Sequence, residues 1–358
     1  MVKYIGSKRA LVPAISALAA QLPVRTACDL FAGTTRVGQA LRAGGLRVHS
    51  NDLATYSEIF GQAYIAADED VDRVRVAAIL CELEKLPGKD GYFTETFCQQ
   101  SRFIQPHNGR RIDAIRDAVD QLELDPIERG IVLTSLVEAA DRVDSTCGLQ
   151  MAYVKQWAKR SYNDLQLRMP AAVGGPAGVV TRLDANELAT DLDAVDLAYI
   201  DPPYNQHSYF ANYHVWETLV RWDAPQHYGI ACKREDCREP ENKSDYNSKR
   251  RAWQAFSGLI ERVASPWMIV SFSNEGYHDP RDLLALLAEK GYARALQVDH
   301  DRYVGAKIGI HSPSGKKVGK VSHVRNHEYL FVVGPDRAVI DGLAGETAFT
   351  ESSHLVAI

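Results

Sequence analysis

Short apolar runs that end near a polar or acidic residue recur along this chain, and they predict its strands. Apolar runs of this length, bounded by turn-forming residues, are typical of buried strands. They occupy residues 26–31, 47–52, 179–186, 197–201, 267–274, 294–298 and 326–333. The segments between them carry apolar residues at helical spacing, so the pattern indicates an α/β fold.

Helices are expected where apolar residues recur at intervals of three or four positions. Near the N-terminus, a helix capped by Ser7 is expected to place Leu11, Ile15, Leu18 and Leu22 on one face. Further helices are expected at residues 36–42, 72–86, 112–122, 126–146, 208–222, 253–263 and 282–290, and a polar loop at 223–251.

The long stretch 59–170 contains no clear strand, and it is too long for a simple connection in a doubly wound sheet. We therefore expect a discontinuous α/β domain formed by residues 1–70 and 176–335. An inserted helical region would span residues 71–175, and residues 336–358 would form a C-terminal tail.

Three of the expected strands end in an aspartate, namely Asp52, Asp184 and Asp201. In an open α/β sheet, ligands bind outside the carboxyl ends of the strands. We therefore expect these three carboxylates to line a single crevice.

A glycine turn, Phe31-Ala32-Gly33-Thr34-Thr35, separates the first expected strand from a helix. This arrangement opens a nucleotide-type fold, in which an acid about 20 residues after the turn reaches the ribose hydroxyls. Asp52 has this spacing from Gly33. Because Thr35 replaces the second glycine that a pyrophosphate cradle needs, a nicotinamide-dependent oxidoreductase fits poorly.

The tetrapeptide Asp201-Pro202-Pro203-Tyr204 follows an apolar strand directly. Each proline lacks a backbone N–H and has a fixed φ, so the strand stops and the turn is stiff. The turn would hold the Asp201 carboxylate, the Pro202 carbonyl and the Tyr204 ring in one arrangement. Two acceptors and one stacking face suit a flat heterocycle that carries an exocyclic NH₂ group. The alternative is a plain strand end with a packed tyrosine.

Composition sets few limits: 46% of the residues are hydrophobic, 24% are charged, and the formal net charge is −5. No window approaches about 18 apolar residues, so no membrane span is expected. The first residues lack the apolar core of a signal peptide. The six cysteines form no Cys-x-x-Cys pair, so a metal site is not expected and a reducing cytoplasm fits.

The net negative charge argues mildly against a nucleic-acid partner, but basic residues cluster locally. Candidates for phosphate contact are Arg110 and Arg111, then Lys155, Lys159 and Arg160, which Trp157 and Tyr162 accompany, and finally Lys316, Lys317 and Lys320 in a hairpin that turns at residues 313–316. Cations interleaved with aromatics favour contacts with phosphates and stacked bases. A solvated surface remains the alternative for each cluster.

Asp201-Pro202-Pro203-Tyr204, preceded by an arm, a glycine turn and a helical insertion, resembles the S-adenosylmethionine-dependent DNA adenine-N6 methyltransferases of the D12 class. The resemblance covers residues 3–56 and 179–333 and is specific at the tetrapeptide. It implies a Rossmann-like methyltransferase sheet, mostly parallel with a late antiparallel hairpin, and a helical target-recognition region at 71–175. It also implies S-adenosylmethionine as cofactor, double-stranded DNA as substrate, and a flipped-out target base.

The resemblance also implies roles for individual residues. Asp201 and the Pro202 carbonyl would accept the hydrogens of the adenine N6 amine, Pro203 would stiffen the turn, and Tyr204 would stack on the base. Asp52 would bind the ribose hydroxyls of the cofactor, and Asp184 its adenine amine. The full set of implied cofactor residues is Tyr4, Ile5, Gly6, Lys8, Asp29, Phe31, Ala32, Gly33, Thr34, Asp52, Leu53, Asp184, Ala185 and Asp201.

Several alternatives remain open at this point. The same chemistry would serve cytosine N4, adenine in RNA, or a glutamine amide of a protein. A subunit that binds nucleic acid without catalysis is a different class, disfavoured by the intact tetrapeptide. A cognate restriction endonuclease is a partner that the motifs neither require nor exclude, and a cytoplasmic, prokaryotic or phage-type protein bound to DNA is expected.

Overall fold

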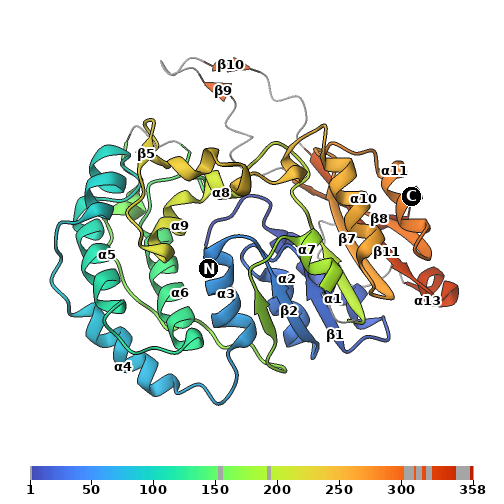
Figure 1. Cartoon of the computed structure of the whole chain (residues 1–358), viewed down its shortest axis with the longest axis horizontal. Coiled ribbons are helices and arrows are strands. Elements are labelled where there is room, and N and C mark those ends of the chain that lie inside the picture. The colour runs from blue at the N-terminus through green and yellow to red at the C-terminus, as the bar shows by residue number, and fades with distance from the viewer. Residues whose placement is uncertain are drawn as a thin grey trace. The chain divides into compact units, whose positions relative to one another are not determined.

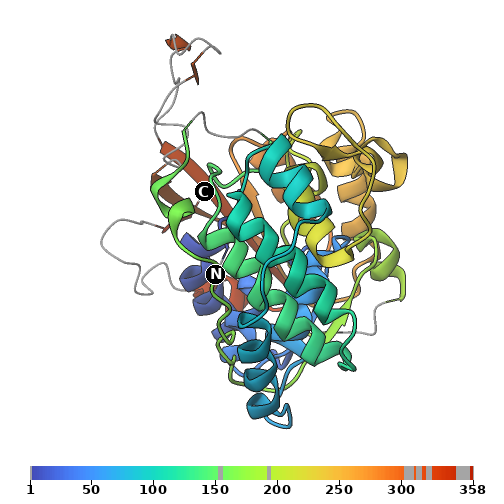
Figure 2. The ribbon, with the colours of Figure 1, turned by 90° about the vertical axis from the view of Figure 1, so that its left-hand side faces the viewer.

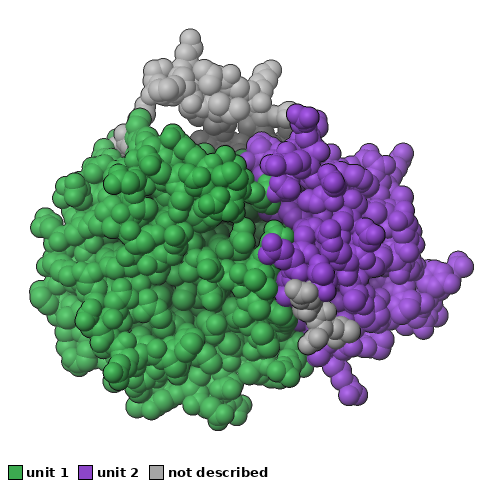
Figure 3. Space-filling model, viewed as in Figure 1, with its two compact units in different colours: residues 1–7, 31–185, 207–244 green, residues 8–30, 186–206, 245–358 purple. Residues whose placement is uncertain are grey.

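The computed structural model describes residues 2–151, 156–191, 195–301, 310–311, 317–319, 325–343 and 355–357. The chain forms two compact units, coloured separately in Figure 3. Unit 1 comprises residues 1–7, 31–185 and 207–244, and unit 2 comprises residues 8–30, 186–206 and 245–358. Each unit is described by itself below.

Unit 2 contains the larger part of the strands, in the order β12-β8-β11-β7-β4-β1. Strands β1, β4 and β7 are parallel, whereas β11 pairs antiparallel with both β7 and β8, and β12 pairs antiparallel with β8. The predicted late hairpin is thus confirmed. The bounds are β1 Thr26–Asp29, β4 Leu197–Ile200, β7 Trp267–Ser273, β8 Tyr292–Asp301, β11 Arg325–Gly334 and β12 Leu355–Ala357.

The helices of unit 2 include α1 Val12–Ala20, α10 Ala252–Arg262, α11 Pro280–Ala288 and α13 Arg337–Gly342 (Figure 1). The prediction that Ser7 caps the first helix is wrong. A 3-10 turn, η1 Lys8–Ala10, comes first, and α1 begins after Leu11 with a proline in its first turn. Proline suits that position because the first N–H groups of a helix have no intrahelical partner.

Unit 1 contains the parallel pair β2 Arg47–Asn51 and β3 Val179–Thr181, with helix α2 Arg36–Ala43 between the glycine turn and β2. The third predicted strand is shorter than expected. It ends at Thr181, and helix α7 Ala185–Asp191 begins four residues later. Asp184 therefore lies just before a helix rather than at a strand end. Asn51 explains the early end, since its side chain binds the backbone N–H and C=O of Leu183.

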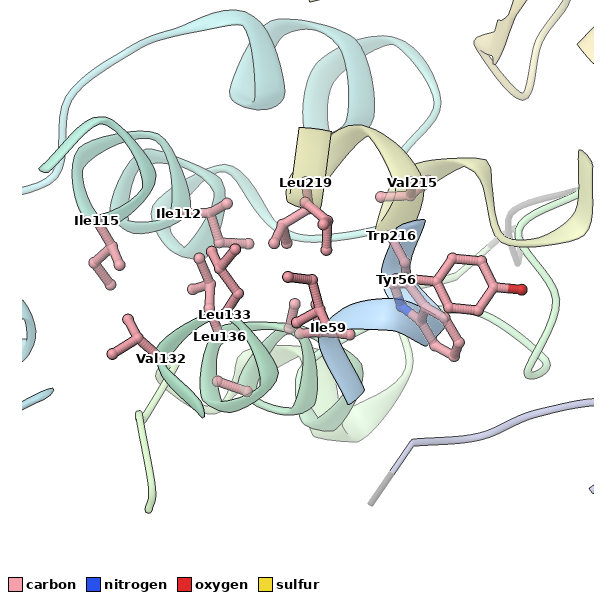
Figure 4. Packing of buried hydrophobic residues seen from close by; sticks show 14 of the residues in the cluster. Tyr56, Ile59, Ile112, Ile115, Val132, Leu133, Leu136, Val215, Trp216 and Leu219 are labelled. Carbon is pink, nitrogen blue, oxygen red and sulfur yellow. The ribbon is translucent and has the colours of Figure 1, made fainter. Parts of the chain in front are cut away.

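A helical core makes up the rest of unit 1. The predicted helices are present as α4 Arg73–Glu84, α5 Pro106–Val119 and α6 Pro126–Arg142, and they run alongside one another in both ribbon views (Figures 1 and 2). Their apolar faces meet helix α3 Thr55–Gly61 and α9 His214–Arg221 (Figure 4). The labelled contacts include the fully buried Ile112, Ile115, Val132, Leu133, Leu136 and Leu219.

Helix α6 shows why these segments fold locally. Asp125 accepts hydrogen bonds from the N–H groups of Ile127 and Glu128, and the Glu128 side chain accepts one from the N–H of Asp125. This capping box satisfies the exposed donors of the first turn. Two π-helical segments, η2 Gln62–Ala66 and η3 Thr94–Gln100, were not predicted. A single extra residue in a helical turn leaves no clear mark on hydrophobic spacing.

Two predictions for residues 208–251 are wrong in detail. The single helix expected at 208–222 is two helices, α8 Tyr209–Asn212 and α9, separated at Tyr213. The expected polar loop contains a small hairpin, β5 His227–Tyr228 with β6 Lys233–Arg234, followed by 3-10 turns. Arg234 orders it, because its buried guanidinium binds Asp223 and Asp236 at 2.7 Å.

Between β8 and β11 along the chain, the structure describes a further pair of short strands. Strands β9 Ile310–His311 and β10 Lys317–Gly319 pair antiparallel, while the predicted turn at residues 313–316 lies outside the described residues. Across the residues that the structure describes, no helix combines the length and apolar character needed to cross a membrane.

Candidate active site

The predicted tetrapeptide begins at the carboxyl end of β4, in unit 2. All four residues of β4 are buried, and Asp201 follows directly. The carboxylate of Asp201 lies 3.1 Å from the ammonium of Lys8. Lys8 also lies 3.4 Å from the carboxylate of Glu328 on β11. One buried cation is therefore shared by two carboxylates.

The electrostatics of this group follow from burial and mutual charge. Burial raises the pKa of Asp201 to about 6, while the ammonium of Lys8 opposes the rise and the carboxylate of Glu328 adds to it. Burial by itself would lower the pKa of Lys8, but the two carboxylates hold it well above its ordinary value. Lys8 therefore stays protonated, and Asp201 is ionised above about pH 6.

Tyr204 completes the same group. Its ring lies 5.1 Å from the Lys8 ammonium and 5.6 Å from the ring of Phe272. Its backbone carbonyl accepts a hydrogen bond of 3.0 Å from the N–H of Tyr277. The aromatic face is thus held in place by its neighbours and by the backbone.

The glycine turn and Asp52 come together in unit 1. One oxygen of Asp52 accepts the N–H of Gly33 at 2.8 Å, and the other accepts the N–H of Ala54 at 2.9 Å. The backbone N–H of Leu53 and the hydroxyl of Ser57 also interact with this carboxylate. Burial raises the pKa of Asp52, and the backbone N–H groups partly offset that rise.

Tyr4 covers the glycine turn. A Cβ atom at Gly33, whose φ is +51°, would lie 3.2 Å from Cε1 of Tyr4. The Tyr4 ring also stacks on Tyr213 at 4.5 Å and on Tyr209 at 5.3 Å, and Tyr213 stacks on Trp216 at 4.6 Å. The N-terminal arm is thus fixed by an aromatic column, and the N–H of Ile5 donates to the Tyr213 hydroxyl.

Thr35 stands at the position where the second glycine was expected. It adopts a left-handed φ of +59°, which L residues seldom adopt. Its hydroxyl donates to the carbonyl of Thr34 and receives a hydrogen bond from Gln39. The turn therefore keeps a glycine-like backbone without a glycine.

The other expected cofactor residues divide between the units. Phe31, Ala32 and Thr34 lie in the glycine turn, which belongs to unit 1. Gly6 of the arm and the exposed Leu53 belong to the same unit. Asp184 is exposed, and Ala185 begins α7. Asp29 is buried at the end of β1 in unit 2, with Lys8 and the tetrapeptide.

The basic candidates have different surroundings. Arg110 pairs with Asp90, while Arg111 donates to the carbonyls of Glu84 and Leu165. Arg160 binds Asp144 through two nitrogens, and Lys159 is exposed. Lys155, Lys316 and Lys320 lie outside the described residues, and Lys317 belongs to β10. Their contact with DNA remains a prediction.

Sequence reasoning missed Glu328 and the column formed by Tyr209, Tyr213 and Trp216 as parts of these groups. Glu328 carried little signal, because it follows the polar residues Arg325, Asn326 and His327 in the same strand and the apolar run begins only after it. The aromatic residues at 209–216 have the spacing of an ordinary packed helix, so their pattern carried no signal either.

The profile of the family described as D12 class N6 adenine-specific DNA methyltransferase matches residues 4–262. The Type II methyltransferase M.NlaIII of Neisseria lactamica is 29% identical over 319 residues, which cover 85% of this chain and 93% of that protein.

Two longer relatives also match. The modification methylase StsI of Streptococcus sanguinis is 31% identical over 305 residues, 80% of this chain and 46% of that protein. The Type II methyltransferase M.FokI of Planomicrobium okeanokoites is 27% identical over 344 residues, 91% of this chain and 51% of that protein. This chain thus spans about half the length of these two relatives.

The matched family segment includes the glycine turn, Asp52 and the tetrapeptide, so it covers the residues that carried the sequence resemblance. The Rossmann-like fold class and the assignment to an enzyme that methylates adenine in DNA are both confirmed. The alternative activities are not favoured. The chain belongs to the D12 class N6 adenine-specific DNA methyltransferases.

Proposed function

We propose that this enzyme takes the methyl group from S-adenosylmethionine and that Asp201, Pro202 and Tyr204 hold the target adenine. The observation that supports this proposal is the buried Asp201 carboxylate, which is ionised at neutral pH beside Lys8. Tyr204, whose backbone is held by a hydrogen bond, follows it closely along the chain. A carboxylate and a carbonyl accept the two hydrogens of an exocyclic amine. The tyrosine ring supplies a stacking face for its base.

The residues of unit 1 fit the proposed cofactor chemically. The Asp52 carboxylate lies beside the glycine turn, and carboxylate oxygens accept hydrogen bonds from hydroxyl groups such as those of a ribose. Gly33 has no side chain, which lets the Tyr4 ring pack directly over the turn. When bound, S-adenosylmethionine supplies an electrophilic methyl group on a sulfonium. The remaining residues expected around it keep the roles that the resemblance implies.

The protein's own contribution is positioning. The lone pair of the adenine amine is delocalised into the ring, which makes the amine a weak nucleophile. Hydrogen bonds accepted by Asp201 and the Pro202 carbonyl favour a tetrahedral nitrogen with a directed lone pair. Fixed acceptors and a fixed stacking ring lower the barrier through orientation and preorganised electrostatics. A base inside a duplex is out of reach, so the target must be flipped out.

Three wider proposals accompany this one. The helical region 71–175 would read the DNA sequence, with the basic candidates in contact with phosphates. A cognate restriction endonuclease would be a functional partner, since relatives carry the names Type II methyltransferase and modification methylase. The protein would act in the cytoplasm on chromosomal or phage DNA.

The test is incubation with unmethylated genomic DNA and radiolabelled S-adenosylmethionine, followed by nucleoside analysis. Label is expected in N6-methyladenine, and Asp201→Ala should abolish it while leaving cofactor binding mostly intact. Asp282→Ala, which removes an acid from the first turn of α11, serves as the matched control. Label in N4-methylcytosine, or an active Asp201→Ala variant, would contradict the proposal.

A further inference from the structure

The alternation of side chains along the strands of unit 2 places a row of polar residues on one face of the sheet. Tyr199 of β4 is level with Ile269 of β7, so Asp201, two residues later, falls on the same face as Ser271. Glu328 of β11 is paired with Ser273, which shares that face. Asp201 and Glu328 therefore flank β7 on the same side.

Lys8 connects the two acids across β7. Neighbouring strands lie about 4.8 Å apart, so two strands on either side of a third are separated by about 10 Å. The small side chains of Ser271 and Ser273 leave room above β7, and the Lys8 ammonium lies there, 3.1 Å from Asp201 and 3.4 Å from Glu328. The exposed fractions are 7% for Lys8, 15% for Asp201 and 8% for Glu328.

This sharing bears on the acceptor that the target amine needs. A lysine with one carboxylate partner directs its hydrogen bonds and its charge at that partner. When a second carboxylate is present, the two carboxylates share the hydrogen bonds and the charge. In the described part of unit 2, Glu328 is the acid that draws Lys8 away from Asp201. Without it, the ammonium would compete more strongly with the adenine amine for the oxygens of Asp201.

We propose that Glu328 is a positioning residue of the methyl-transfer reaction, which holds Lys8 so that the Asp201 carboxylate stays available to the amino group of the target adenine. The inference rests on the proposed role of Asp201. Glu328 acts through Lys8 and does not itself touch the reacting atoms.

The charged and titratable groups around Asp201 set the direction of the expected pH effect. Lys8 faces it from η1 and lowers its pKa, while Glu328 from β11 raises it. Tyr199 and Tyr204 lie in the same group and have strongly raised pKa values, so they remain neutral, and Asp29 acts on Tyr199 from β1. Removing the charge of Glu328 therefore lowers the pKa of Asp201.

The experiment is the pH dependence of the single-turnover methylation rate in the full-length Glu328→Gln variant. We expect the plateau rate to fall about tenfold and the acidic limb to move down by about one pH unit. Affinity for S-adenosylmethionine should stay unchanged. Glu328→Asp keeps the charge and should return the limb toward its wild-type position.

Glu275→Gln is the matched control, because the charge of Glu275 acts on Tyr204 in the same unit, whereas the charge of Glu328 pairs directly with Lys8. It should leave the limb in place. A Glu328→Gln variant whose rate falls at every pH with an unmoved limb and a lower Tm would overturn the inference, because that is the result of a structural role. The Asp201→Ala variant separates the two claims. If Asp201→Ala is active, the proposed function fails. If Asp201→Ala is inactive while Glu328→Gln behaves like the wild type, only the proposed role of Glu328 fails.

Discussion

The ammonium of Lys8 lies 3.1 Å from the carboxylate of Asp201, within the distance at which an amine donates a hydrogen bond. Lys8 comes from the 3-10 turn before α1, and Asp201 from the end of β4. Burial raises the pKa of Asp201 and this contact opposes that rise, and several predictions depend on the balance.

The methylation rate should fall as the pH drops through about 6. In the proposed mechanism Asp201 accepts the hydrogens of the amine only as a carboxylate, and burial raises its pKa to about 6 from an ordinary value of 3.8. Lys8→Met removes the cation that opposes this rise, so its acidic limb should lie at higher pH than that of the wild type. Single-turnover rates between pH 5 and 9 measure both limbs. A wild-type limb near pH 4 would be inconsistent with a buried catalytic carboxylate.

Asp201→Asn should increase the stability of the protein at pH 8. Because the folded-state pKa of Asp201 lies above the unfolded value, the wild type loses stability as the pH rises through about 6, whereas an amide does not titrate. A difference of two pKa units corresponds to at most about 3 kcal/mol. Thermal unfolding should show a higher Tm for the variant at pH 8 and no such gain at pH 4. The same gain at both values would show that the carboxylate is not the cause.

Gly33→Ala should weaken cofactor binding and lower stability by about 1–3 kcal/mol. The new methyl group would meet the Tyr4 ring at 3.2 Å, at a φ of +51° that alanine tolerates poorly. Adding Tyr4→Ala should remove the clash but not the backbone strain. Calorimetric titration with S-adenosylmethionine and thermal unfolding measure the two effects. Gly45→Ala, also at positive φ but with no atom near its Cβ, isolates the strain.

Tyr204→Phe should retain most activity, whereas Tyr204→Ala should slow methylation by ten- to a hundredfold. Stacking of a base on an aromatic ring contributes about 1–3 kcal/mol, and phenylalanine keeps that face. It also keeps the contacts of the ring with Lys8 and Phe272. Single-turnover rates with saturating DNA make the comparison. Equal losses in both variants would point to the hydroxyl instead of the ring.

Lys159→Gln and Arg160→Gln should have different effects although the residues are adjacent. Exposed Lys159 is a candidate for phosphate contact, so its loss should weaken DNA binding and reduce the salt slope by about one, with Tm unchanged. Arg160 binds Asp144 and the carbonyl of Thr146, so its loss should lower Tm. Binding titrations at several salt concentrations and thermal unfolding separate the two. An unchanged salt slope for Lys159→Gln would remove it from the DNA surface.

The sequence by itself determined the class of fold and the place of the tetrapeptide at the end of a buried strand. Apolar runs identified the strands within a few residues, because burial on both faces of a sheet demands continuous hydrophobicity. The Asp201-Pro202-Pro203-Tyr204 turn could be predicted because proline constrains the backbone through its own ring. The end of β3 was misplaced, since the side chain of Asn51 binds Leu183 from a distant part of the chain.

Only the tertiary structure decided which charges meet. Glu328 is far from Asp201 along the chain, and strand pairing across β7 brings both to Lys8. Tyr4, Tyr209 and Tyr213 likewise form a column because two helices and the N-terminal arm pack together. Hydrophobic spacing reports which face of an element is buried, but not which element covers it. Contacts between distant side chains depend on which element covers which face, and here they shift the pKa of Asp201 and place Tyr4 over the glycine turn.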